Sequence, residues 1–219
     1  MPFFMSIKVL IACEQSQTVC AAFRRLGIET YSNDILPCYG GHPEWHIIGD
    51  ATHVVQGNGK FMLESGECID ILGRWDLIIA HPPCTMLTHS SAVAYSKGLH
   101  TDAQVARAKD FFLAMLNAPA EYVAVENPAP MKWIGLPRYN QIIQPYQFGE
   151  RYSKRVCLWL RNLPPLIPVR GYSTQHVQWT KHCSGRPARR AKTFPLVAEA
   201  MAENWGPWII KEKQKQKYS

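Results

Sequence analysis

A cysteine follows two prolines at the end of an apolar run in DLIIAHPPC, residues 76–84. A second apolar run, EYVAVENP (121–128), ends in a glutamate and an asparagine. A thiolate is a nucleophile and a carboxyl group can move a proton, so Cys84 and Glu126 are candidates for covalent catalysis with acid–base assistance. The alternative for a cysteine is an inert thiol in the core, which we expect for Cys13, Cys20, Cys68 and Cys157.

Other expected strands are also followed by an acidic residue. Cys13-Glu14, Asp34 and Asp50 each follow a short apolar or mixed segment. An acid at the end of the second strand can accept hydrogen bonds from both ribose hydroxyls of a nucleoside cofactor, and Asp50 could accept one from an adenine amino group. The alternative for each aspartate is the start of a turn.

The elements that must position these residues alternate between strand and helix. We expect strands at 7–13, 29–34, 45–51, 75–83 and 121–128, and helices at 18–27, 102–117 and 195–206. The order predicts an α/β fold with a doubly wound, mostly parallel sheet. Ligands of such sheets lie outside the carboxyl ends of the strands, where the residues above are found.

The charge of the chain is concentrated in its last third. Residues 1–150 contain 10 Lys and Arg against 14 Asp and Glu, whereas residues 151–219 contain 14 against 3. Cations there are interleaved with Tyr152, Tyr172, Trp179 and Phe194, a pattern typical of contact with phosphates and bases. We therefore expect a polyanionic partner, and a solvated, disordered tail at 211–219.

Several classes of protein are disfavoured by the sequence. No apolar run reaches the length of a membrane helix, and no charged-then-apolar leader precedes the first strand, so we expect a cytoplasmic protein with reduced thiols. The 219 residues favour a single domain, and no obligate protein partner is evident. His176, His182, Cys183, Cys38 and His42 match no zinc-finger spacing, so no metal is expected.

Taken together, the segments DLIIAHPPC, VAVENP and SKRVCLWL (153–160) resemble the Pro-Cys, Glu-Asn and Arg-containing motifs of the DNA (cytosine-5) methyltransferases. The likeness to small phage and prophage members extends over residues 7–206. It implies a Rossmann-like fold dependent on S-adenosylmethionine as cofactor, with DNA as partner. It also implies a catalytic and cofactor-binding domain at 1–161, a reduced basic target-recognition segment at 162–194 and a helix at 195–210 that returns to the core.

The resemblance assigns roles to single residues. Cys84 would add to carbon 6 of cytosine, Glu126 would stabilise ring N3, and Arg155 would hold the ring carbonyl or orient the thiol. The residues implied at the cofactor are Ala12, Cys13, Glu14, Ser16, Asp34, Ile35, Asp50, Ala51, His81 and Pro82. The residues expected at DNA are Ser90, Lys97, Lys154, Arg186, Arg189, Arg190 and Lys192. His81 could also relay a proton, and 85–100 could close over a flipped base.

Two departures from the family pattern keep other functions open. The first strand is followed by CEQSQT, where glycines normally let the backbone approach the cofactor. The segment at 162–194 is much shorter than the usual target-recognition region. The alternatives are a non-catalytic DNA-binding accessory protein of anti-restriction type, and the same thiol chemistry on a modified donor or nucleotide.

Overall fold

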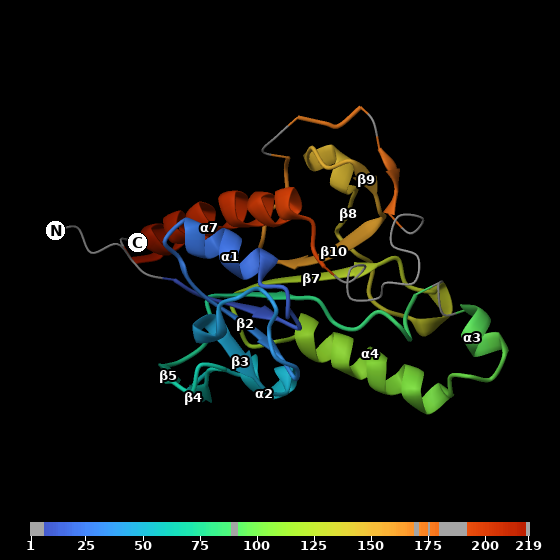
Figure 1. The fold of residues 1–219 in the computed structure, drawn as a ribbon, viewed down its shortest axis with the longest axis horizontal. Coiled ribbons are helices and arrows are strands. Elements are labelled where there is room, and N and C mark those ends of the chain that lie inside the picture. Colours follow the sequence, from blue (N-terminus) through green and yellow to red (C-terminus); the bar gives the residue numbers. More distant parts are fainter. Residues whose placement is uncertain (1–6, 89–91, 169–170, 175, 180–191, 218–219) are drawn as a thin grey trace.

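The computed structural model describes residues 7–88, 92–168, 171–174, 176–179 and 192–217 (Figure 1). Its strands are β1 (Lys8–Ala12), β2 (Glu29–Asp34), β3 (His46–Ile48), β4 (Gly59–Met62), β5 (Cys68–Ile71), β6 (Leu77–Ala80), β7 (Tyr122–Pro128), β8 (Gln141–Ile143), β9 (Tyr152–Ser153), β10 (Val156–Arg161) and β11 (Val177–Gln178). Its α-helices are α1 (Thr18–Arg25), α2 (Ala51–Val54), α3 (Ala92–Ser96), α4 (Asp102–Leu116) and α7 (Pro195–Lys217). Short 3-10 helices are η1 (Pro43–Trp45), η3 (Lys132–Ile134) and η4 (Pro145–Phe148).

The main sheet has seven strands in the order β3-β2-β1-β6-β7-β10-β8. The first five are parallel, and β10 runs antiparallel to both β7 and β8. The five parallel strands have the order typical of a doubly wound nucleotide-binding sheet. In this order the chain adds strands on one side of β1 first and on its other side afterwards. The predicted fold class is therefore confirmed, with an antiparallel strand inserted near one edge.

Helices cover both faces of this sheet. In Figure 1, α1 and α7 lie above the strands, and α2 and α4 lie below them. The central strands β1, β6 and β7 are almost completely buried, which explains why their sequences are continuous apolar runs rather than alternating ones. Side chains of alternate strand positions enter two separate apolar cores, one under α1 and α7 and one over α4.

The C-terminal helix is longer than predicted. The glycine at 206 and the proline at 207 indicated an end near 206, but α7 continues to Lys217, so the expectation of a disordered tail from 211 is wrong for residues 211–217. The extra turns are held by polar contacts to residues just before β6 and β7, because Lys213 pairs with Asp76 and Gln216 donates to Glu121 at 3.0 Å. No helix in the described ranges, α7 included, combines the length and apolarity needed to cross a membrane.

Three further features were not predicted. The antiparallel pair β4–β5 follows α2, and its Cys68 is exposed rather than buried, because this hairpin lies outside the main sheet. The strands β8 and β10 extend the sheet beyond β7. The stretch 85–100 contains the short helix α3 in its described part.

Candidate active site

Hydrogen bonds join the turn after β6 to the neighbouring strands β1 and β7. The backbone N–H of His81 donates to the carbonyl of Ala12 at 3.0 Å, and the side-chain amide of Asn127 donates to the carbonyl of Pro82 at 2.8 Å. His81 Nδ1 lies 3.2 Å from Glu126 Oε2. Because β6 and β7 are adjacent and parallel, these contacts bring the Cys84 turn and Glu126 to the same edge of the sheet.

Glu126 is held as a carboxylate despite its burial. Its side chain is only 15% exposed. Burial by itself raises the pKa of Glu126, but the hydrogen bond from His81 and the positive charges of Lys154 and His81 outweigh it and lower the pKa below its usual value. The site therefore contains a desolvated carboxylate stabilised by nearby cationic groups.

The thiols of the described cysteines fall into different environments. Burial raises the pKa of Cys13 to about 12, with further increases from Asp34 and Asp50, and burial also raises the pKa of Cys20 and Cys157. A thiol that remains protonated at neutral pH is a poor nucleophile. Cys84 is partly exposed at the carboxyl end of β6, the position that a nucleophile for an external substrate requires.

Lys154 and Arg155 lie in different environments. The charge of Lys154 acts on Glu126, whereas Arg155 is exposed and donates to the hydroxyl of Tyr139 at 3.2 Å. The structure thus places Lys154, rather than Arg155, in electrostatic contact with the candidate catalytic carboxylate.

The acids expected at the cofactor converge on the end of β1. Asp34 and Asp50, from the ends of β2 and β3, both act electrostatically on Cys13. Asp34 Oδ1 accepts from the backbone N–H of Leu36 at 3.0 Å, and Asp50 Oδ1 caps α2 by accepting from Thr52 N at 2.8 Å. The two carboxylates therefore lie near Cys13, at the carboxyl ends of three adjacent strands.

The side chains of Glu14 and Ser16 form hydrogen bonds within the protein. The Glu14 carboxylate is buried and accepts from the backbone N–H groups of Val19 at 2.7 Å and Cys20 at 3.1 Å, and from the Ser16 hydroxyl at 3.2 Å. Burial is the main cause that raises the pKa of Glu14. Both side chains thus satisfy the start of α1 instead of projecting from the sheet edge.

The remaining cofactor positions differ in accessibility. Ala12, Ala51 and Pro82 are buried, and the side chain of His81 lies against Glu126. Ile35, directly after Asp34, is 70% exposed. An exposed apolar side chain beside two carboxylates is suited to cover an aromatic ring held at this edge.

The turn after β1 adopts glycine-like geometry without glycine. Cys13 and Gln17 have φ of 61° and 55°, both in the left-handed region. Gln17 supports this conformation with its buried side chain, because its Nε2 donates to the carbonyl of His42 at 2.7 Å and its Oε1 accepts from His42 N at 3.0 Å. Gly40 lies against Gln17, and a Cβ at Gly40 would lie 2.5 Å from Cβ of Gln17.

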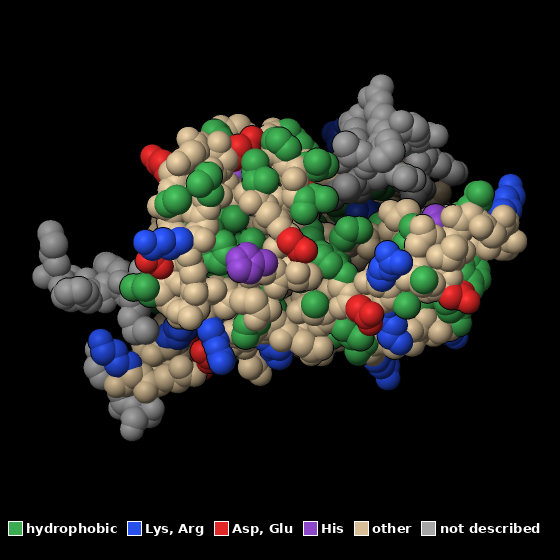
Figure 2. Space-filling view, turned by 90° about the horizontal axis from the view of Figure 1, so that it is seen from below, with side chains coloured by type: hydrophobic (Ala, Val, Ile, Leu, Met, Phe, Trp, Pro, Cys, Tyr) green, Lys and Arg blue, Asp and Glu red, His purple; other side chains and the backbone are tan. Residues whose placement is uncertain are grey.

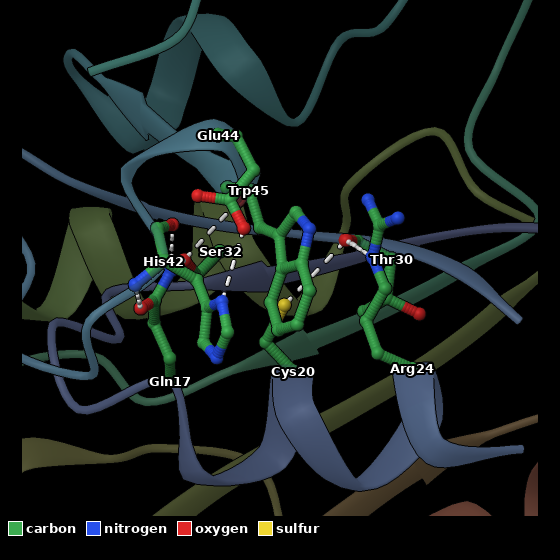
Figure 3. Close-up of polar contacts among 8 residues, drawn as sticks. All are labelled: Gln17, Cys20, Arg24, Thr30, Ser32, His42, Glu44 and Trp45. Atoms are coloured by element: carbon green, nitrogen blue, oxygen red, sulfur yellow. Dashed lines mark hydrogen bonds and ion pairs between the residues drawn. The ribbon is translucent and has the colours of Figure 1, made fainter. Parts of the chain in front are cut away.

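Figure 3 shows how α1, β2 and the η1 segment are joined beside this turn. Gln17 also donates to Ser32 Oγ at 3.2 Å, and Arg24 Nε donates to the carbonyl of Thr30 at 2.7 Å. The rings of His42 and Trp45 are stacked with centroids 3.7 Å apart. These contacts fix the loop that follows Asp34.

The residues expected at DNA are only partly covered by the structure. Lys97 and Lys192 are exposed and Lys154 is partly buried. Ser90, Arg186, Arg189 and Arg190, as well as His182 and Cys183, lie outside the described residues. Figure 2 shows the face covered by α2 and α4, where the Lys and Arg side chains of the described residues are scattered among acidic and apolar ones rather than gathered in a basic patch.

Some residues of the site were not identified from the sequence. The hydrogen bond from Asn127 to Pro82 and the electrostatic effect of Lys154 on Glu126 both depend on which strands are neighbours, which a single sequence does not specify. Tyr95, in α3 after the Cys84 turn, and Trp133, in η3 after β7, form an aromatic pair with ring centroids 4.9 Å apart, in which Tyr95 is partly buried and Trp133 is exposed. The spacing of aromatic residues carries no signal for such a pair. Among the described residues no cluster of His, Cys, Asp and Glu could hold a metal ion.

Comparison with known proteins found likeness only to solved structures. No protein family profile matches the sequence, and no curated protein matches it. An Escherichia coli prophage-encoded protein assigned as a DNA modification methyltransferase aligns with a TM-score of 0.42 and 11% identity over 78% of this chain and 53% of its own. The Dnmt2 methyltransferase of S. pombe gives 0.41 and 16% over 75% and 52%, and the Entamoeba histolytica methyltransferase EhMeth gives 0.41 and 12% over 78% and 58%. This chain therefore spans between 52% and 58% of the length of these three structures.

Proposed function

We propose that this protein transfers a methyl group from S-adenosylmethionine to carbon 5 of cytosine in DNA through a transient covalent bond to Cys84. The observation that carries the proposal is the double attachment of the Cys84 turn to β7, through His81 to Glu126 and through Pro82 to Asn127. A partly exposed thiol and a desolvated carboxylate on adjacent strand ends form a pair suited to attack on a planar ring.

Each step assigns a task to a residue of this chain. The Cys84 thiolate forms a bond to carbon 6 of the ring, while Glu126 supplies a proton or hydrogen bond to N3 and so stabilises the charge that develops. This addition makes carbon 5 nucleophilic, and carbon 5 then accepts the methyl group. Loss of the carbon-5 proton to a base breaks the bond between carbon 6 and sulfur and releases Cys84.

The residues at the ends of β1, β2 and β3 fit the cofactor. Asp34 and Asp50 offer carboxylate oxygens, which suit ribose hydroxyls and an adenine amino group, and Ile35, directly after Asp34, offers an exposed apolar surface. The left-handed Cys13 and Gln17 provide the turn geometry for which other Rossmann-like sheets use glycine. When bound, S-adenosylmethionine supplies an activated methyl group on a sulfonium.

Trapping on DNA containing 5-fluorocytosine tests the proposal. Carbon 5 of this base carries no proton to lose, so a methylated adduct should remain attached to the protein. The expected result is a covalent complex that forms with the wild type and S-adenosylmethionine and is absent in Cys84→Ser. Cys68→Ser is the matched control, because Cys68 is exposed but lies on the separate β4–β5 hairpin. It should form the adduct at the wild-type rate.

DNA binding without adduct or methyl transfer would contradict the proposal and support an accessory DNA-binding protein. An adduct that forms equally well in Cys84→Ser would also contradict it, because another nucleophile would then be responsible. A titration with S-adenosylmethionine in Asp34→Asn and Asp50→Asn tests the cofactor assignment separately. Both substitutions should weaken binding by roughly tenfold, since each removes a charge-assisted hydrogen bond.

A further inference from the structure

Trp133 differs from the other tryptophans in its exposure to solvent. All seven tryptophans of the chain lie among the described residues, and Trp133, at 54%, is the only one of them that is exposed rather than buried or partly buried. It lies in η3, the segment that follows β7 and Glu126. Because exposed tryptophan is enriched at binding surfaces, the surroundings of this ring indicate what it could bind.

The backbone that leads into η3 is joined to the Cys84 turn. The N–H of Leu87 donates to the carbonyl of Cys84 at 3.0 Å, and the N–H of Met131 donates to the carbonyl of Leu87 at 2.9 Å. Thr88 and Pro130 form an antiparallel bridge next to these contacts. The segments that follow the proposed nucleophile and the proposed catalytic carboxylate are therefore joined to each other before they reach the aromatic pair.

Tyr95 supports the tryptophan ring from one side. The two ring planes are inclined at 40°, with centroids 4.9 Å apart. Tyr95 is partly buried against the apolar core over α4, and its hydroxyl donates to the carboxylate of Asp102, the first residue of α4. In Figure 1, α3 lies beside this end of α4, at the margin of the molecule. The position of the Trp133 ring is thus supported, while much of its surface stays open to a ligand.

Lysines lie next to the aromatic pair. Lys132 and Lys97, which adjoin Trp133 and α3, are exposed. Lys109, on α4, lies beside the end of η3, because its Nζ is 3.5 Å from the position that a Cβ would take at Gly135. None of these three lysines forms an ion pair with another described residue. An open aromatic face beside unpaired cations suits a nucleobase and the phosphates on either side of it.

We propose that Trp133 stacks on an unpaired nucleobase of the DNA strand that carries the reacting cytosine, while the neighbouring lysines contact its phosphates. The choice of DNA as the ligand rests on the proposed function and extends it beyond the reacting groups. A cytosine that reaches Cys84 must leave the base stack, and stacking on Trp133 offsets part of the cost of unstacking the strand. Since every base has a π-face, this contact holds the strand without reading its sequence.

Binding to two single-stranded probes of equal length tests the proposal. One probe is an oligodeoxycytidine, and the other is its abasic analogue, which keeps the phosphates and lacks the bases. Trp133→Ala should lower the affinity for oligodeoxycytidine by about tenfold, as expected for the loss of a stacked base, and leave the affinity for the abasic strand within about twofold. Trp133→Phe should keep most of the affinity, because it keeps an aromatic face. Fluorescence anisotropy of the labelled strands measures both affinities.

Leu72→Ala is the matched control for removal of an exposed apolar side chain. Leu72 is 80% exposed and directly follows β5, on the hairpin outside the main sheet, so its removal should change neither affinity. Lys132→Gln is the control for the phosphate contacts. It should weaken the binding of both probes by the same factor, since both carry the same phosphates.

Three results would overturn the stacking role: no binding of oligodeoxycytidine by the wild type, no difference between the two probes in Trp133→Ala, or a Trp133→Phe variant as weak as Trp133→Ala. If the wild type and Trp133→Ala then form the 5-fluorocytosine adduct equally well, the proposed function stands without this contact. Base-dependent binding that requires Trp133, without adduct or methyl transfer, would support the stacking role while the proposed function falls. The two proposals can therefore fail separately.

Discussion

The side-chain amide of Asn127 donates a hydrogen bond of 2.8 Å to the main-chain carbonyl of Pro82, two residues before Cys84. Asn127 is itself 2% exposed and directly follows Glu126 on β7. One residue pair therefore connects the backbone that presents the thiol to the strand that presents the carboxylate. The two prolines add stiffness to the same turn, because each fixes its own φ.

Replacing Asn127 should consequently affect the position of Cys84 as well as stability. Asn127→Ala leaves the Pro82 carbonyl without its partner, which costs about 1–3 kcal/mol of unfolding free energy. We also expect trapping on 5-fluorocytosine to slow by about a hundredfold, since displacement of a nucleophile by about 1 Å has effects of this size. Denaturant unfolding and the rate of adduct formation measure the two effects.

Asn204→Ala provides the control for this prediction. Asn204 also donates from its side chain to backbone carbonyls, those of Ile167 at 3.2 Å and Ala200 at 2.9 Å, but it lies on α7. It should lose stability without losing the rate of adduct formation. Equal losses of rate in both variants would show that Asn127 acts through stability alone.

Glu14 and Glu126 should give opposite dependences of stability on pH. Burial raises the pKa of Glu14, so above the ordinary glutamate value of about 4.3 the folded state binds more protons than the unfolded state and stability declines with rising pH. Glu14→Gln removes this decline and keeps an oxygen that can accept from Val19 and Cys20. We expect its stability relative to the wild type to increase between about pH 4 and pH 7.

The opposite sign is expected for Glu126→Gln. The folded-state pKa of Glu126 is lowered, so its contribution to stability is present above the ordinary glutamate pKa and is lost as pH falls through the folded value. Relative to the wild type, this variant should therefore lose stability as pH rises toward about 4.3 from below, and the difference should stay constant at higher pH. Urea unfolding of the three proteins at several pH values measures both trends, and trends of the same sign would contradict the assigned environments.

Because the backbone of Cys13 is in the left-handed region, we expect glycine to be more stable than alanine at position 13. A side chain at φ of 61° costs about 1–2 kcal/mol relative to glycine, and the greater freedom of glycine in the unfolded chain offsets about 0.4–1 kcal/mol. Cys13→Gly should thus be more stable than Cys13→Ala by up to about 1.6 kcal/mol. Cys20, inside α1, is the control, because there glycine should be less stable than alanine by about 1 kcal/mol.

The central part of the fold could be predicted because its signals are local. Continuous apolar runs such as 75–83 indicated strands buried on both faces, and the structure places β6 within that run. The end of α7 could not be predicted, because Gly206 and Pro207 are local signals for a helix end, and the polar contacts of Lys213 and Gln216 that accompany the longer helix join segments far apart in the sequence. The β4–β5 hairpin was missed because its strands are short and largely exposed, so neither contains a continuous apolar run.

The site was predicted as a set of strand ends, and the structure adds which of them are in contact. The types of Cys84, Glu126 and Asp34 indicated chemistry, and parallel strands bring their carboxyl ends to one edge. The roles of Glu14 and Gln17 depend on the conformation of the turn after β1, which the absence of glycine concealed. The contact between His81 and Glu126 requires the register of β6 and β7, which only the folded chain defines.

Adjacent cations before β10 provide the last prediction. Lys154 acts on Glu126, whereas Arg155 contacts Tyr139, so Lys154→Met should slow adduct formation by about tenfold, equivalent to about 1.4 kcal/mol, through loss of stabilisation of the carboxylate. Arg155→Met should have the smaller effect on this step and serves as the matched control for removal of a positive charge. If Arg155→Met has the larger effect, the arginine must move to the ring when the substrate binds, as the resemblance to cytosine-5 methyltransferases implies. Rates of trapping at saturating DNA distinguish the two outcomes, because weaker binding to phosphates no longer limits the rate under that condition.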